Sequence, residues 1–163
     1  MSAAGESLAL LFSELIDGPK GACYMLNSGD RGLLASLDTL SPAAASAVPR
    51  GGGASIAAHV DHVLYGLHLM NQWAAGDDDP WSDADWTASW QRTSVDDAEW
   101  AALRAQLRIE TGKWRDALSR AEDLAGLELN GAIASVAHLA YHLGAIRQID
   151  RSMRGPSAEE SGS

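Results

Sequence analysis

The feature that most constrains this chain is the stretch from Ser135 to Ile146, which is apolar but carries two histidines. His138 and His142 are four residues apart, so on an α-helix they lie on one face with Cβ atoms roughly 5–6 Å apart. Both imidazole rings can then turn toward one metal ion. Buried histidines can also be core residues that hydrogen-bond to a carbonyl group or to a hydroxyl such as that of Tyr141. The pair alone leaves both interpretations open.

The other three histidines, His59, His62 and His68, all fall on one other predicted helix. A third ligand from that helix would complete a three-histidine site with one or more open coordination positions, which is typical of catalytic metal centres. Helical periodicity places His59 inside the apolar arc, His62 at its edge and His68 on the polar side. Periodicity therefore favours His59 as the inward-facing histidine and predicts that His68 is a solvated surface residue.

Apolar residues at helical spacing predict an all-α chain without strands or internal repeats. The predicted helices are a short one over residues 6–16, segments over 32–40 and 43–47, and long helices over 56–73, from 94 onward and from 130 to about 151. Ser55, Ser94 and Asn130 are the expected N-cap residues, and Asp97 stands at the fourth place of a capping-box pattern that begins at Ser94. The expected fold is an antiparallel four-helix bundle with an extra short N-terminal helix.

Length and charge restrict the class of protein. We expect one domain over residues 1–152, followed by a polar, disordered tail over 153–163. The single cysteine, Cys23, and an N-terminus without a basic region or a long apolar run predict a cytoplasmic protein. With 22 acidic and 12 basic residues the net charge is −10, which argues against binding to nucleic acids or anionic membranes.

One carboxylate stands out on the helix that begins near Ser94. Glu110 falls on the apolar stripe of that helix, where a buried carboxylate is costly without a partner. It is a candidate metal ligand or catalytic base. The alternative is a structural ion pair with Arg108 or Lys113.

The connection over residues 74–93 is unusually rich in acids and tryptophans. It contains an acidic run and then Trp81, Trp86 and Trp90. The acids lack the glycine and the closing glutamate of an EF-hand, so a solvated turn is favoured over a calcium site. The tryptophans either cover a pocket or pack onto the helices.

Two segments resemble the second and last helices of the DinB-like superfamily of metal-binding four-helix bundles, which includes YfiT-like hydrolases and bacterial thiol-dependent transferases. They are Ser55-Ile56-Ala57-Ala58-His59-Val60-Asp61-His62-Val63, and His138-x3-His142 followed by Gly144 and Ile146. The resemblance covers roughly residues 30–150. It implies one divalent ion held by His62, His138 and His142, whereas periodicity leaves His59 as the alternative third ligand. Leu143 and Ala145 stand where the family commonly has Arg and Gln, so the resemblance does not extend to that polar pair.

The resemblance implies a metal-dependent enzyme, either a hydrolase or a transferase or isomerase that uses a low-molecular-weight thiol. Histidine ligands suit zinc, nickel, iron or manganese. The alternative is a bundle without turnover that binds a metal or a small ligand, or that acts as a stress-related homodimer module. No Ser-His-Asp order, phosphate-binding glycine loop or dinucleotide motif is present. The substrate is not identified by any motif.

Overall fold

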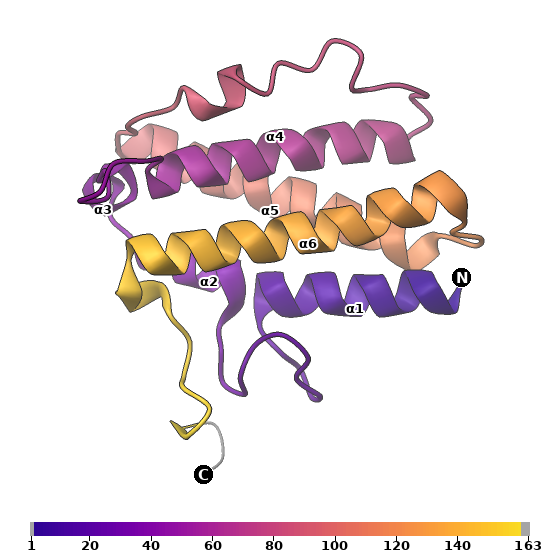
Figure 1. Ribbon diagram of the computed structural model, residues 1–163, viewed down its shortest axis with the longest axis horizontal. Coiled ribbons are helices and arrows are strands. Elements are labelled where there is room, and N and C mark those ends of the chain that lie inside the picture. Colours follow the sequence, from indigo (N-terminus) through magenta and orange to yellow (C-terminus); the bar gives the residue numbers. More distant parts are fainter. Residues whose placement is uncertain (1, 161–163) are drawn as a thin grey trace. The chain divides into compact units, whose positions relative to one another are not determined.

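The computed structural model describes residues 2–160, and over this range it is helical without strands (Figure 1). The α-helices are α1 (Ala3–Asp17), α2 (Gly32–Leu37), α3 (Pro42–Ser46), α4 (Ile56–Ala74), α5 (Asp97–Arg120) and α6 (Gly126–Ile149), with short 3-10 helices η1 (Ala88–Trp90) and η2 (Arg151–Met153). The all-α prediction is confirmed. The first helix was expected to be short but spans 15 residues. Among the described residues, no helix combines the length and apolarity needed to cross a bilayer.

The chain divides into two compact units. Of the described residues, those up to Asp38 and from Arg115 onward form the terminal unit, and Thr39–Trp114 form the central unit. Helix α5 continues through the boundary, so its last turns belong to the terminal unit. The expectation of a single domain over residues 1–152 stays a prediction.

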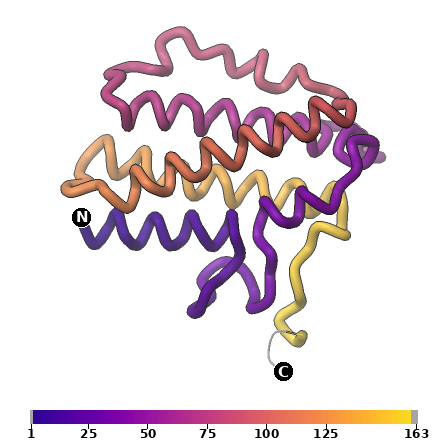
Figure 2. The backbone as a smooth tube through the Cα atoms, turned by 180° about the vertical axis from the view of Figure 1, so that it is seen from behind, coloured from indigo at the N-terminus to yellow at the C-terminus, as the bar shows by residue number. Residues whose placement is uncertain are grey.

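In the terminal unit, α1 and α6 lie side by side and run in the same direction (Figures 1 and 2). The inward faces of its helices carry the buried apolar side chains Leu8, Phe12, Leu15, Ile16, Leu33, Leu37, Leu118, Val136, Leu139, Leu143 and Ile146. Met153, which the sequence assigns to the tail, is also buried. The carbonyl oxygen of Pro156 accepts a hydrogen bond of 2.8 Å from the Asn27 amide. Disorder of the tail stays a prediction, and residues 161–163 lie outside the described residues.

In the central unit, α4 and α5 also run in the same direction, because the connection over residues 75–96 returns along α4 before α5 begins (Figures 1 and 2). The expected fold is an antiparallel four-helix bundle; the described residues form an all-helical structure with four long helices, of which this pair is parallel. A short loop would force α5 to run back along α4, but this long connection carries the chain to the end where α4 began. Buried residues of the unit include Ile56, Val60, Val63, Leu67, Trp100, Leu103 and Leu107.

Local capping explains where α4 and α5 begin. Ser55 is the N-cap of α4 as predicted, since its hydroxyl accepts a hydrogen bond of 3.2 Å from the Ala58 amide. For α5 the predicted cap is wrong by two residues. Asp96 and Glu99 cap each other: the Asp96 amide donates to the Glu99 carboxylate at 2.9 Å, and the Glu99 amide donates to the Asp96 carboxylate at 2.8 Å. A glutamate is long enough to close such a box, whereas the predicted box relied on a shorter aspartate.

The last helix begins earlier than its predicted cap. Asn130 lies inside α6, which starts at Gly126 and has no side-chain cap. Gly126 has a φ of 54°, a conformation that glycine adopts readily. Residues 127–129 contain no proline or glycine, so the helix continues from there without interruption. The first turn also contains Glu128, whose negative charge suits the positive end of the helix dipole.

Candidate metal centre

The histidine pair of α6 has the geometry that the sequence predicts. His142 is buried and His138 is half-buried, and their Nε2 atoms are 3.0 Å apart. Two nitrogens bound to one zinc ion at about 2.0–2.1 Å lie about 2.9–3.4 Å apart in octahedral to tetrahedral geometry. Burial lowers the pKa of His138, because the charged ring loses solvation. The neutral ring, which is the form that binds a metal, is thereby favoured.

His62 lies on α4, and a hydrogen bond determines which of its nitrogens carries the proton. The ring is buried, and its Nδ1 atom is 2.8 Å from the hydroxyl oxygen of Ser89. That hydroxyl donates its single proton to the carbonyl oxygen of Trp86 at 2.7 Å. The hydroxyl oxygen of Ser89 must therefore accept a hydrogen bond from the Nδ1–H group of His62, so in the neutral ring Nδ1 carries the proton and Nε2 carries the lone pair.

Two tryptophans of the connection hold the His62 ring. Trp90 stacks on it with ring centroids 4.1 Å apart and an angle of 21° between the planes. Trp86 packs at a tilted angle, with centroids 5.7 Å apart. The connection therefore packs onto α4 through its aromatic side chains, which is one of the two roles that the sequence left open for it.

The structure places His59 and His68 differently from His62. His59 is half-buried and meets the Trp90 ring edge-on at 5.3 Å, and burial lowers its pKa. His68 is exposed, as predicted. Periodicity favours His59 as the inward residue, yet His62 is the more buried of the two, with 7% of its surface exposed. A helical wheel does not include the connection, which covers the edge of the stripe where His62 lies.

Three histidines lie close enough together to share a metal ion. One nitrogen each from His62, His138 and His142 lies within 4.8 Å of the other two. Three neutral imidazoles suit a divalent transition metal and leave coordination positions open for water or a substrate. Among the described residues, neither His59 nor Glu110 belongs to this group. The donor set does not identify the metal.

Glu110 is buried, with 3% of its surface exposed, and it has two side-chain partners. Lys113 donates to its carboxylate at 2.7 Å, and the Asn71 amide donates to the other oxygen, also at 2.7 Å. Burial acts to raise the pKa of Glu110, but these hydrogen bonds and the nearby charges of Lys113 and His68 outweigh it, so the pKa is lowered. The pairing with Lys113 that the sequence offers as an alternative is present.

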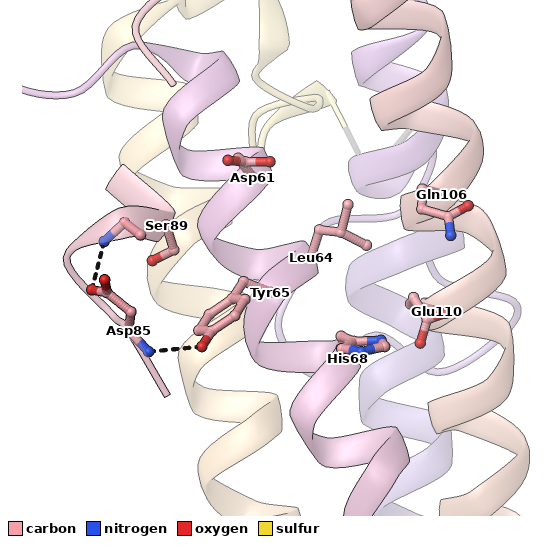
Figure 3. A pocket seen from close by; sticks show the side chains of 9 residues that line it. Asp61, Leu64, Tyr65, His68, Asp85, Ser89, Gln106 and Glu110 are labelled. Carbon is pink, nitrogen blue, oxygen red and sulfur yellow. Dashed lines mark hydrogen bonds between the residues drawn. The ribbon is translucent and has the colours of Figure 1, made fainter. Parts of the chain in front are cut away.

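A cavity of about 400 Å³ lies beside the connection, within the central unit (Figure 3). In Figure 3 the His68 ring and the Glu110 carboxylate point toward each other, and Tyr65 lies beside Asp85. The hydroxyl oxygen of Tyr65 accepts a hydrogen bond of 2.9 Å from the Asp85 amide. Two of the carboxylates that line this cavity are paired with cations, Asp61 with Arg92 at 3.0 Å and Glu110 with Lys113 at 2.7 Å.

Sequence reasoning missed Ser89. It is a single serine within a polar connection, and the residue that it contacts is 27 positions away. No local pattern relates two positions at that separation, and only its burial in the folded chain distinguishes it from its neighbours.

Neither a scan against protein-family models nor searches of curated proteins and of solved structures find a match for this chain.

Proposed function

We propose that this chain is a DinB-like helical bundle that binds one divalent metal ion through His62, His138 and His142 and keeps an open coordination position for catalysis. The observation that carries the proposal is the grouping of one nitrogen from each of these histidines within 4.8 Å. Histidines are scarce in this chain, which has five. Three of the five share one small volume.

The state of the individual rings supports metal binding. The hydrogen bond from His62 to Ser89 leaves the lone pair of His62 on Nε2. The 3.0 Å separation of Nε2 in His138 and His142 matches that of two nitrogens on one ion. In the metal-free chain a proton occupies this short contact, and a metal ion would take its place.

The proposed chemistry is hydrolysis, or transfer or isomerisation with a low-molecular-weight thiol. A divalent ion with an open position can activate water near neutral pH or stabilise a thiolate. The chain would contribute the three imidazoles that hold the ion and the aromatic side chains that shield His62 from solvent.

Metal content tests the proposed site directly. Protein purified without added metal or chelator should contain about one divalent ion per chain, measured by elemental analysis. His138→Ala or His142→Ala should weaken metal binding by more than about 100-fold, because removing a ligand costs at least as much as removing the residue that orients it. His68→Ala is the matched control, since this histidine lies exposed on the same helix as His62. Full occupancy in the His138 or His142 variant would refute the site.

Two further comparisons separate the alternatives. His62→Ala should cost metal and His59→Ala should not, whereas the reverse result would show that periodicity identifies the third ligand correctly. Metal-loaded and metal-depleted protein should then be assayed with a panel of thiol and ester substrates. Metal binding without turnover on any member of the panel would favour a non-enzymatic metal-binding bundle.

A further inference from the structure

The hydroxyl of Ser89 is the buried polar group of the connection. It lies in η1 (Ala88–Trp90) and is 6% exposed, while Ala88 and Trp90 on either side of it are exposed. Burying a hydroxyl is costly unless its hydrogen bonds are satisfied. The Ser89 hydroxyl makes two hydrogen bonds within the protein, one with the carbonyl oxygen of Trp86 and one with Nδ1 of His62.

Proton counting gives this contact a definite direction. The 2.7 Å between the Ser89 hydroxyl and the Trp86 carbonyl is a hydrogen-bond distance, and the carbonyl has no proton to give. The serine proton is therefore in that bond. The proton in the 2.8 Å contact with His62 must then come from Nδ1 of the imidazole.

The tryptophan and the serine control different properties of the ring. Stacking on Trp90 defines the plane of the His62 imidazole. Stacking does not select between the two ring orientations that differ by a 180° flip, because both lie in the same plane. Ser89 does distinguish them, since the turned ring would present a carbon instead of Nδ1 to the hydroxyl.

We propose that Ser89 is a positioning residue of the metal centre, which holds His62 in the Nδ1-protonated tautomer and in the orientation that presents Nε2 to the ion. This inference rests on the proposed function. It also assigns a role to the connection, which orients a ligand from outside the helices that carry the ligands. Residues that orient metal-bound histidines in this way typically contribute 10–100-fold to metal affinity.

The tautomer can be measured without any metal. Long-range ¹H–¹⁵N correlation spectra of metal-depleted protein, recorded where the histidines are neutral, distinguish a protonated ring nitrogen from one that carries a lone pair. The His62 signals are identified by their loss in His62→Ala. In the parent protein we expect the proton of His62 on Nδ1, and in Ser89→Ala a mixture of both tautomers.

Metal affinity is the second measurement. Titration of metal-depleted protein with Zn²⁺ should show affinity that is about 10-fold or more weaker in Ser89→Ala. Ser89→Thr keeps the hydroxyl and should restore both the tautomer and most of the affinity. Ser82→Ala is the matched control, because this serine lies exposed in the same connection. It should change neither measurement.

The outcomes separate this inference from the proposed function. A parent protein with the His62 proton on Nε2 would overturn the inference, and so would a Ser89→Ala variant that binds Zn²⁺ as tightly as the parent. A parent protein that binds none of Zn²⁺, Ni²⁺, Fe²⁺ and Mn²⁺ would refute the proposed function and, with it, the role of Ser89 at a metal centre. The tautomer spectrum would still report whether Ser89 orients His62.

Discussion

Replacing Glu14 by glutamine tests a buried carboxylate that no sequence pattern identifies. Glu14 lies on α1 with 3% of its surface exposed. One carboxylate oxygen accepts hydrogen bonds from the amides of Tyr24, Met25 and Leu26 at 3.0, 2.8 and 2.7 Å. The other oxygen lies 3.2 Å from the Tyr24 amide. This side chain therefore holds the loop between α1 and α2 by its backbone.

The size of the effect follows from these contacts. Glutamine can keep an oxygen at the position of Oε1, but the three bonds lose their charge, and a charged bond is worth roughly 1 kcal/mol more than a neutral one. The glutamine NH₂ group would also face the Tyr24 amide, donor against donor. Allowing for relaxation of an exposed loop, Glu14→Gln should lower the free energy of unfolding by about 2–3 kcal/mol. For a chain of this size the melting temperature should fall by roughly 5–10 °C.

Urea and thermal unfolding followed by circular dichroism would measure this loss. Glu6→Gln is the matched control, because Glu6 lies exposed on the same helix. It should cost less than about 1 kcal/mol, the usual size of an interaction with the helix dipole. A Glu14→Gln protein within about 0.5 kcal/mol of the parent would show that the loop amides gain as much from water as from the carboxylate, and the reasoning would fail.

Two other predictions concern backbone strain and pH. Gly18→Ala should destabilise by more than about 2 kcal/mol, because φ is 83° and the new Cβ would meet the carbonyl of Asp30. Gly52→Ala, with φ of 81° and open space around it, should cost only about 1 kcal/mol in the same unfolding assay; equal losses would mean that the contact with Asp30 relaxes. The folded-state pKa of Glu110 is lowered, so its stabilising contribution is complete above its unfolded pKa and is lost as the pH falls through its folded pKa. Glu110→Gln should therefore flatten the acid side of the curve of unfolding free energy against pH, and an unchanged slope would contradict that assignment.

Features governed by neighbours along the chain were predictable from the sequence. The all-α class follows from apolar spacing, and Ser55 was identified as a cap because capping joins a side chain to an amide three residues away. The relation between His138 and His142 is similarly local, since one helix turn sets it. The predicted starts of α5 and α6 are wrong because several residues near each start could act as the N-cap. For α5 the length of the Glu99 side chain selects Asp96 as the cap, and α6 has no side-chain cap at all.

Features that depend on which part of the fold a segment distant in sequence packs against were not predictable from periodicity. Periodicity cannot rank His59 and His62, because the burial of each depends on the connection that follows α4. The common direction of α4 and α5 likewise depends on the path of that connection rather than on either helix (Figure 1).

The helical class of the chain and the helix face shared by His138 and His142 can both be predicted from residue spacing alone. Those properties depend on backbone geometry that repeats every few residues. Periodicity favours His59 and the resemblance implies His62, and it is the tertiary structure that buries His62 and places Ser89 against its Nδ1 atom. A hydrogen bond between positions 27 residues apart depends on the path of the intervening chain, and helical periodicity carries no information about that path.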